Sequence, residues 1–155
     1  MTDNRNPGAA ASKVAIFYLA SRESKTFDVP SGATVEAAID AALAAFPDLT
    51  PEGFGGRSSD PFGFAEVATA IAFLRRCKPK KVPNRNSYAL KHAAERWGRR
   101  NGMAGYVSNG ALILVAVYLG FTISDPDGGP NVFIGVGRRS VRELEPEVNR
   151  RTGWL

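Results

Sequence analysis

The lysine and arginine side chains of residues 75–100 have the clearest capacity for chemistry in this chain, which is to bind anions. This segment holds ten of the twenty basic residues and one of the fifteen acidic residues, so its formal charge is +9. The remaining residues hold ten basic and fourteen acidic side chains, a charge of −4. A cationic segment in an otherwise mildly acidic protein indicates a surface for an anionic partner.

Nucleic acid is the partner that this pattern favours. A duplex carries one charge per about 1.7 Å, and each neutralised phosphate releases counterions. We expect residues 78–85 to be extended along a phosphate backbone, and a helix at 88–100 to lay its outer face across phosphates. Tyr88 is expected on the polar side of that helix, where it could stack on a base. The predicted nucleic-acid-binding residues are Arg75, Arg76, Lys78, Lys80, Lys81, Arg85, Tyr88, Lys91, Arg96 and Arg99.

The one nucleophile–base pair to consider for covalent catalysis is formed by the single cysteine and the single histidine. The basic neighbours of Cys77 could lower the pKa of its thiol, and His92 could then act as the base. Nothing in the sequence brings the two residues together, and Cys77 is better explained by packing at a helix end. We therefore expect a non-enzymatic protein, and the lone cysteine agrees with a cytoplasmic location.

Two loop motifs could bind ions, but turn formation explains both. Asp125 and Asp127 are spaced like two oxygen ligands, yet their proline and glycine neighbours are typical of a hairpin turn. Residues 135–140 could hold an anion at a helix start, with Arg138 and Arg139 as secondary phosphate contacts. That motif lacks the third glycine of the dinucleotide fingerprint and the lysine of a P-loop. The sequence therefore predicts no cofactor and no metal.

Length and composition fit one soluble domain. The chain has 155 residues, of which 44% are hydrophobic and 23% charged. We expect a disordered tail at residues 1–12, one domain at 13–148 and a C-terminal tail at 149–155. The longest apolar run, residues 111–119, is shorter than the roughly 18 residues that span a bilayer, so no membrane partner is expected.

Residue patterns predict an α+β domain, with a small, mostly antiparallel sheet packed by three to four helices. Strands are expected at 13–20, 25–29, 121–124 and 131–136. Helices are expected at 34–46 with Thr34 as cap, from Asp60-Pro61 to about 77, at 88–100 with Asn86 or Ser87 as cap, and after Ser140. For residues 111–119, Ser108 and Gly120 favour a helix and the β-branched residues a strand. Both assignments stay open, with the helix preferred.

The helices expected at 88–100 and 111–119 do not fit a helix-turn-helix that reads bases. The second helix of that motif presents polar side chains to base edges, whereas residues 111–119 are apolar. Residues 101–107 also form a longer connection than the usual turn of about three to four residues. We therefore expect contacts mainly to phosphates and weak sequence preference.

Two stretches resemble known families. Asn84-Arg85-Asn86-Ser87-Tyr88-Ala89-Leu90-Lys91-His92 and Tyr106-Val107-Ser108-Asn109-Gly110-Ala111-Leu112-Ile113, within residues 84–121, resemble uncharacterised small proteins of bacterial mobile elements and phages. That resemblance implies a partner in DNA handling or host defence. Residues 13–49 resemble the start of the ubiquitin-like sulfur carriers, which implies a strand–strand–helix opening. Those carriers act through a C-terminal Gly-Gly, and this chain ends Gly153-Trp154-Leu155.

These observations lead to one hypothesis and one alternative. The hypothesis is a non-enzymatic accessory protein of a bacterial mobile element that binds nucleic acid, DNA or RNA, mainly at its phosphates. The alternative is a protein-interaction module, such as an inhibitor of a host defence complex, in which the same segment binds an acidic protein surface. A solvated linker and an ordinary charged helix face would also give this pattern.

Overall fold

The apolar segment that the sequence leaves open is a helix, α5 (Asn109–Leu119). The computed structural model describes residues 29–145. The Ser108 hydroxyl accepts a hydrogen bond from the Ala111 N–H at 3.1 Å, and Gly120 ends the helix with a left-handed φ of 84°. A serine cap and a left-handed glycine both belong to helix ends, so these local signals decide the assignment.

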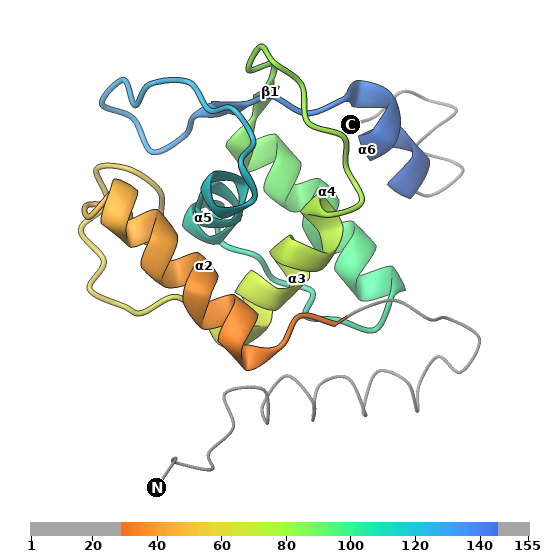
Figure 1. Cartoon of the computed structure of the whole chain (residues 1–155), viewed down its shortest axis with the longest axis horizontal. Helices are drawn as coiled ribbons and strands as arrows, with labels where there is room; N and C mark the ends of the chain where they lie inside the picture. The colour runs from red at the N-terminus through yellow and green to blue at the C-terminus, as the bar shows by residue number, and fades with distance from the viewer. Residues whose placement is uncertain (1–28, 146–155) are drawn as a thin grey trace, which may run out of the picture.

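Three helices contact α5, namely α2 (Gly32–Ala45), α3 (Phe64–Leu74) and α4 (Ser87–Arg100). Figure 1 shows α5 enclosed by these helices. All residues from Asn109 to Ala116 are buried, because α5 is covered from several sides. Burial of this apolar surface is the main favourable term for the fold.

The helices predicted at 34–46 and 88–100 are confirmed as α2 and α4. The cap of α2 is Ser31 instead of Thr34, since the Ser31 hydroxyl accepts from the Thr34 N–H at 3.1 Å. Asn86 caps α4, and its side-chain oxygen accepts from the Tyr88 N–H at 2.8 Å. Each cap oxygen satisfies an amide that the first helical turn leaves without an intrahelical partner.

Two predicted helix starts are wrong. α3 begins at Phe64 instead of Asp60-Pro61, with Gly63 in an extended conformation at the cap position. The Asp60 N–H donates to the Ser58 hydroxyl at 3.1 Å, before the helix. α6 (Arg138–Leu144) begins before Ser140. Ser140 is not its cap, since its hydroxyl donates to the Gly137 carbonyl at 2.7 Å and accepts from the Lys78 N–H at 2.9 Å.

The sheet is antiparallel, and one of its two strands lies in the predicted basic linker. β1 (Arg85–Asn86) pairs with β2 (Phe133–Ile134), and Arg85 lies opposite Ile134. The strands expected at 121–124 and 131–136 meet in a bridge between Ile123 and Ile134. A second bridge joins Pro79 to Val136, so the linker runs along β2 and its continuation.

Some expectations fall outside the described residues. The strand at 13–20, nearly all of the strand at 25–29, and the two tails at 1–12 and 149–155 lie beyond residues 29–145. Within that range, five helices and a two-stranded sheet form the predicted α+β domain, with more helices than the three to four expected. No helix in that range is long and apolar enough to cross a membrane.

Candidate functional site

The ten residues predicted to bind nucleic acid do not share one surface. Arg76 and Arg96 are half-buried, and Arg85 and Lys91 are buried, with exposed fractions of 8% and 7%. Arginine and lysine are rarely buried without a partner, so we looked for the contacts that these four side chains make within the protein. The exposed members are Arg75, Lys78, Lys80, Lys81, Tyr88 and Arg99.

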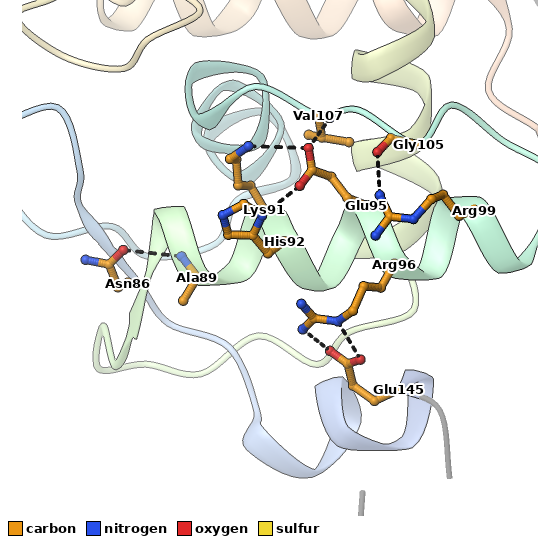
Figure 2. Close-up of polar contacts among 10 residues, drawn as sticks. All are labelled: Asn86, Ala89, Lys91, His92, Glu95, Arg96, Arg99, Gly105, Val107 and Glu145. Atoms are coloured by element: carbon orange, nitrogen blue, oxygen red, sulfur yellow. Dashed lines mark hydrogen bonds and ion pairs between the residues drawn. The ribbon is translucent and has the colours of Figure 1, made fainter. Parts of the chain in front are cut away.

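Lys91 lies beneath a loop and pairs with a buried carboxylate. Its Nζ is 3.3 Å from Oε2 of Glu95, which also accepts from the Val107 N–H at 3.0 Å. The other oxygen of Glu95 lies 2.8 Å from His92 Nδ1 (Figure 2). Burial raises the pKa of Glu95, but the hydrogen bonds from Val107 and His92 and the charge of Lys91 outweigh it, so the pKa is lowered. Glu95 thus ties the loop after α4 to α4 itself.

The opposite side of α4 holds the end of α6. Arg96 contacts Glu145 at two points, Nε to Oε2 at 3.1 Å and Nη2 to Oε1 at 2.8 Å. Glu145 is only 2% exposed. Arg100 adds a hydrogen bond from Nη1 to the Leu144 carbonyl at 2.6 Å. Figure 2 shows the Arg96–Glu145 pair on the side of α4 away from Lys91 and Glu95, so Arg96 serves the fold.

Arg85 is a buried neighbour of this ion pair. Burial lowers the pKa of its guanidinium, as does repulsion from Arg138, whereas Glu145 acts in the opposite direction. Its Nη2 is buried and has no hydrogen-bond partner in the described part of the chain. A buried charge without compensation is costly, so Arg85 depends on the carboxylate of Glu145.

Arg76 and Arg99 also contact the protein itself. Arg76 donates from Nη1 to the Ala72 carbonyl at 2.6 Å, and its guanidinium lies 5.0 Å from the centre of the Trp97 ring. Arg99 donates from Nη1 to the Gly105 carbonyl at 2.9 Å, although its side chain is exposed. Of the two, Arg99 has the better access to a partner.

Hydrogen bonds join two basic segments that are distant in sequence. The Gly137 N–H donates to the Lys78 carbonyl at 2.7 Å, and the Lys80 N–H donates to the Gly135 carbonyl at 2.9 Å. The Lys78 N–H also donates to the Ser140 hydroxyl, 62 residues away. In Figure 1 the segment before β1 passes beside α6. We give the name basic junction to the exposed cations of these two segments, which are Lys78, Lys80, Lys81, Arg138, Arg139 and Arg142.

The basic junction contains a hollow of about 310 Å³, which Lys78, Arg139, Ser140 and Glu143 line. Arg139 lies 3.0 Å from Glu143, but both side chains are well exposed, so water screens the pair. Sequence reasoning named Arg138 and Arg139 as secondary contacts and missed Arg142. Three arginines within five residues after a glycine are the signal that could have found it.

Cys77 does not have the environment of a nucleophile. Its Sγ is buried at the end of α3 and lies 3.6 Å from the Phe73 carbonyl oxygen. Burial raises the pKa of the thiol to about 12, against the weaker opposing charge of Arg85. Packing of Cys77 at a helix end is thus confirmed, and its basic neighbours do not lower the pKa of the thiol because loss of solvation dominates.

Folded protein should resist thiol reagents at about pH 8, since the thiol is buried and protonated there. The measurement is labelling with an aromatic disulfide, with and without denaturant, and with Cys77→Ala as the blank. We expect labelling only in denaturant. Rapid labelling of folded protein would show that Cys77 is accessible and ionised.

Asp127 of the 125–130 loop behaves as a turn residue. Asp127 Oδ1 accepts a hydrogen bond from the Gly129 N–H at 3.1 Å, and Gly128 has a positive φ of 96°. Among residues 29–145, no group of three or more His, Cys, Asp and Glu side chains is placed to hold a metal ion. Local turn geometry accounts for this motif.

Comparison of the chain with protein-family models, with curated proteins and with solved structures found no match.

Proposed function

We propose that this protein binds nucleic acid through phosphate contacts at the basic junction. The supporting observation is the set of hydrogen bonds that places Lys78 and Lys80 beside the start of α6. They bring the backbone of residues 78–80 next to residues 135–140, and the side chains of Lys78 and Arg139 line one hollow. Adjoining cations on one surface can neutralise successive phosphates, and each contact releases counterions.

The proposed contact is to the backbone of the nucleic acid and not to base edges. Long lysine and arginine side chains on a loop and a short helix suit phosphate oxygens, which carry no sequence information. The first eight residues of α5 are buried, so α5 cannot enter a groove as a recognition helix. We expect similar affinity for unrelated sequences.

The wider proposal is a non-enzymatic accessory protein of a bacterial mobile element that acts in the cytoplasm. The resemblance of residues 84–121 to small proteins of such elements supports it by association only. An acidic protein could bind the same cations, and a pull-down from bacterial lysate with and without nuclease distinguishes the two. Partners that survive nuclease treatment would favour the protein-interaction alternative.

Charge reversal in the basic junction should weaken binding to nucleic acid. The test is a titration of labelled single- and double-stranded DNA at several salt concentrations. The variant with both Lys80→Glu and Lys81→Glu should bind at least about tenfold more weakly, because it replaces two phosphate contacts with repulsion. Arg57→Glu, at an exposed position in the loop before α3, is the control and should bind within about twofold of the parent. Absence of binding at low salt, or equal binding by the double variant, would refute the proposal.

A further inference from the structure

A pocket of about 620 Å³ lies beside the N-terminal half of α4. Its volume is within the range of small-molecule sites, which is about 300–1,000 Å³. It includes Lys91, which Figure 2 shows on the side of α4 away from α6, so the pocket is separate from the Arg96–Glu145 contact. The side chains used below are Glu52, Asp60, Tyr88, Lys91, Tyr106 and Asn131, which come from separate segments of the chain.

Hydrogen bonds of Asn109 and of the Gly110 backbone hold the floor of this pocket in place. Asn109 donates from Nδ2 to the Glu52 carbonyl at 3.1 Å and to Asn131 Oδ1 at 2.9 Å. The Gly110 N–H donates to the Pro51 carbonyl at 2.9 Å. A Cβ at Gly110 would lie 1.8 Å from the Thr50 carbonyl oxygen, so only glycine permits this approach. The pocket is therefore formed before any ligand arrives.

Two tyrosine rings at the pocket contact the same cation. The ammonium of Lys91 lies 5.2 Å from the centre of the Tyr88 ring and 5.3 Å from that of Tyr106. These distances fit cation–π contacts, and the Glu95 carboxylate compensates the charge of Lys91. Tyr88 nevertheless remains 50% exposed and Tyr106 62% exposed. Large aromatic side chains that are both positioned and exposed offer a stacking surface for a planar ligand.

Polar groups on the same pocket select among planar ligands. Glu52 and Asp60 are exposed carboxylates that can accept hydrogen bonds from hydroxyl and amino groups, and they repel phosphate. Asn131 adds an amide that can both donate and accept. A ligand that fits has an aromatic plane, several hydrogen-bond donors and no negative charge inside the pocket.

We propose that this pocket binds a nucleobase together with its sugar, supplied either as a free nucleoside or as an unpaired residue of a strand. The base stacks on Tyr88 or Tyr106, and the sugar hydroxyls and amino groups donate to Glu52 and Asp60. Any phosphate stays outside the pocket, away from the carboxylates. This proposal does not depend on the basic junction, which uses different residues.

Calorimetric titration with adenosine, guanosine, cytidine and uridine tests the proposal. At least one nucleoside should bind with a Kd of about 1 mM or tighter. Raising the sodium chloride concentration tenfold should change that Kd by less than about twofold, because no phosphate contact is made. Tyr106→Leu and, independently, Tyr88→Leu should each weaken binding about tenfold through loss of stacking. Phe133→Leu, at a 49% exposed aromatic of β2 that does not line the pocket, should bind as the parent does.

Single-stranded oligonucleotides distinguish the two sources of the base. If Tyr106→Leu weakens the binding of both nucleosides and oligonucleotides, the pocket takes a base of a strand. If it weakens the binding of nucleosides alone, the ligand is a free nucleoside. The Lys80→Glu, Lys81→Glu variant should bind nucleosides as the parent does. A wrong assignment of phosphate binding to the basic junction is therefore distinguishable from a wrong assignment of this pocket. The proposal is overturned if no nucleoside binds or if neither tyrosine variant binds nucleosides more weakly than the parent. It is also overturned if Phe133→Leu weakens nucleoside binding as much as the tyrosine variants do.

Discussion

Glu95→Gln should lower the free energy of unfolding by about 3 kcal/mol, since it breaks a buried ion pair by removing one partner. Glu95 is 6% exposed and Lys91 is 7% exposed, so little water is available to solvate the remaining ammonium. The variant also weakens the hydrogen bond from the Val107 N–H, which holds the loop over α4. Urea unfolding at neutral pH, monitored by circular dichroism, measures the change.

The same carboxylate predicts how stability changes with pH. Burial acts to raise the pKa of Glu95, but Val107, His92 and Lys91 lower it below the ordinary value of 4.5. A carboxylate with a lowered folded-state pKa stabilises the protein above its unfolded-state pKa, and this contribution is lost as pH falls through the folded-state value. The parent should therefore lose stability in acid below about pH 4.5, and the difference between the parent and Glu95→Gln should shrink there.

A double variant separates the energy of the Lys91–Glu95 ion pair from the other effects of losing the Glu95 carboxylate. Adding Lys91→Met removes the ammonium that Glu95→Gln leaves without a partner, so the two effects should not add. The double variant should be more stable than the sum of the single changes predicts by about 1 kcal/mol or more. Strict additivity, or a loss below about 0.5 kcal/mol for Glu95→Gln alone, would mean that the pair contributes little.

Glu145→Ala should also lower the free energy of unfolding by about 3 kcal/mol. The Glu145 carboxylate is 2% exposed and accepts two hydrogen bonds from Arg96. Its removal also leaves buried Arg85 near Arg96 and Arg138 without the carboxylate that opposes their repulsion. Because Arg96 is partly solvated, with 30% of its side chain exposed, the loss belongs at the lower end of the range for buried pairs.

The matched control for this prediction is Glu36→Ala on the exposed side of α2, which should change stability by less than about 0.5 kcal/mol. Urea unfolding gives the free energies, and hydrogen exchange of the α6 amides shows whether α6 detaches first. Equal stability of Glu145→Ala and Glu36→Ala would contradict the role assigned to the Arg96–Glu145 pair.

The helices of this fold are predictable from sequence where their signals are local. Asn86 before α4 and the pair Ser108 and Gly120 around α5 fix helix ends through contacts within a few residues. The start of α6 is not predictable in the same way, because Ser140 there has a partner that is distant in sequence. Ser140 has capping spacing, but its hydroxyl bonds to the Lys78 amide across 62 residues.

Burial of charged residues was the main feature that periodicity could not predict. Lys91 and Glu95 lie on the polar side of α4 by helical spacing, and the loop that carries Tyr106 and Val107 then covers them. The sequence predicts Arg85 as part of an extended basic linker. In the structure it belongs to β1, lies opposite Ile134 and is buried. Charge counts therefore predicted a cationic surface near residues 78–81, but not that residues 138–142 adjoin it.

The most direct test of the basic junction compares salt dependence of DNA binding between the parent and a variant of α6. The variant carries Arg139→Glu and Arg142→Glu, two exposed positions outside the segment with the highest charge. If α6 shares the phosphate contacts of residues 78–81, the slope of log K against log salt should become shallower by about 1.8, or 0.9 for each phosphate lost. An unchanged slope, with Arg57→Glu as the reference, would show that residues 138–142 do not contact the nucleic acid and would contradict the account.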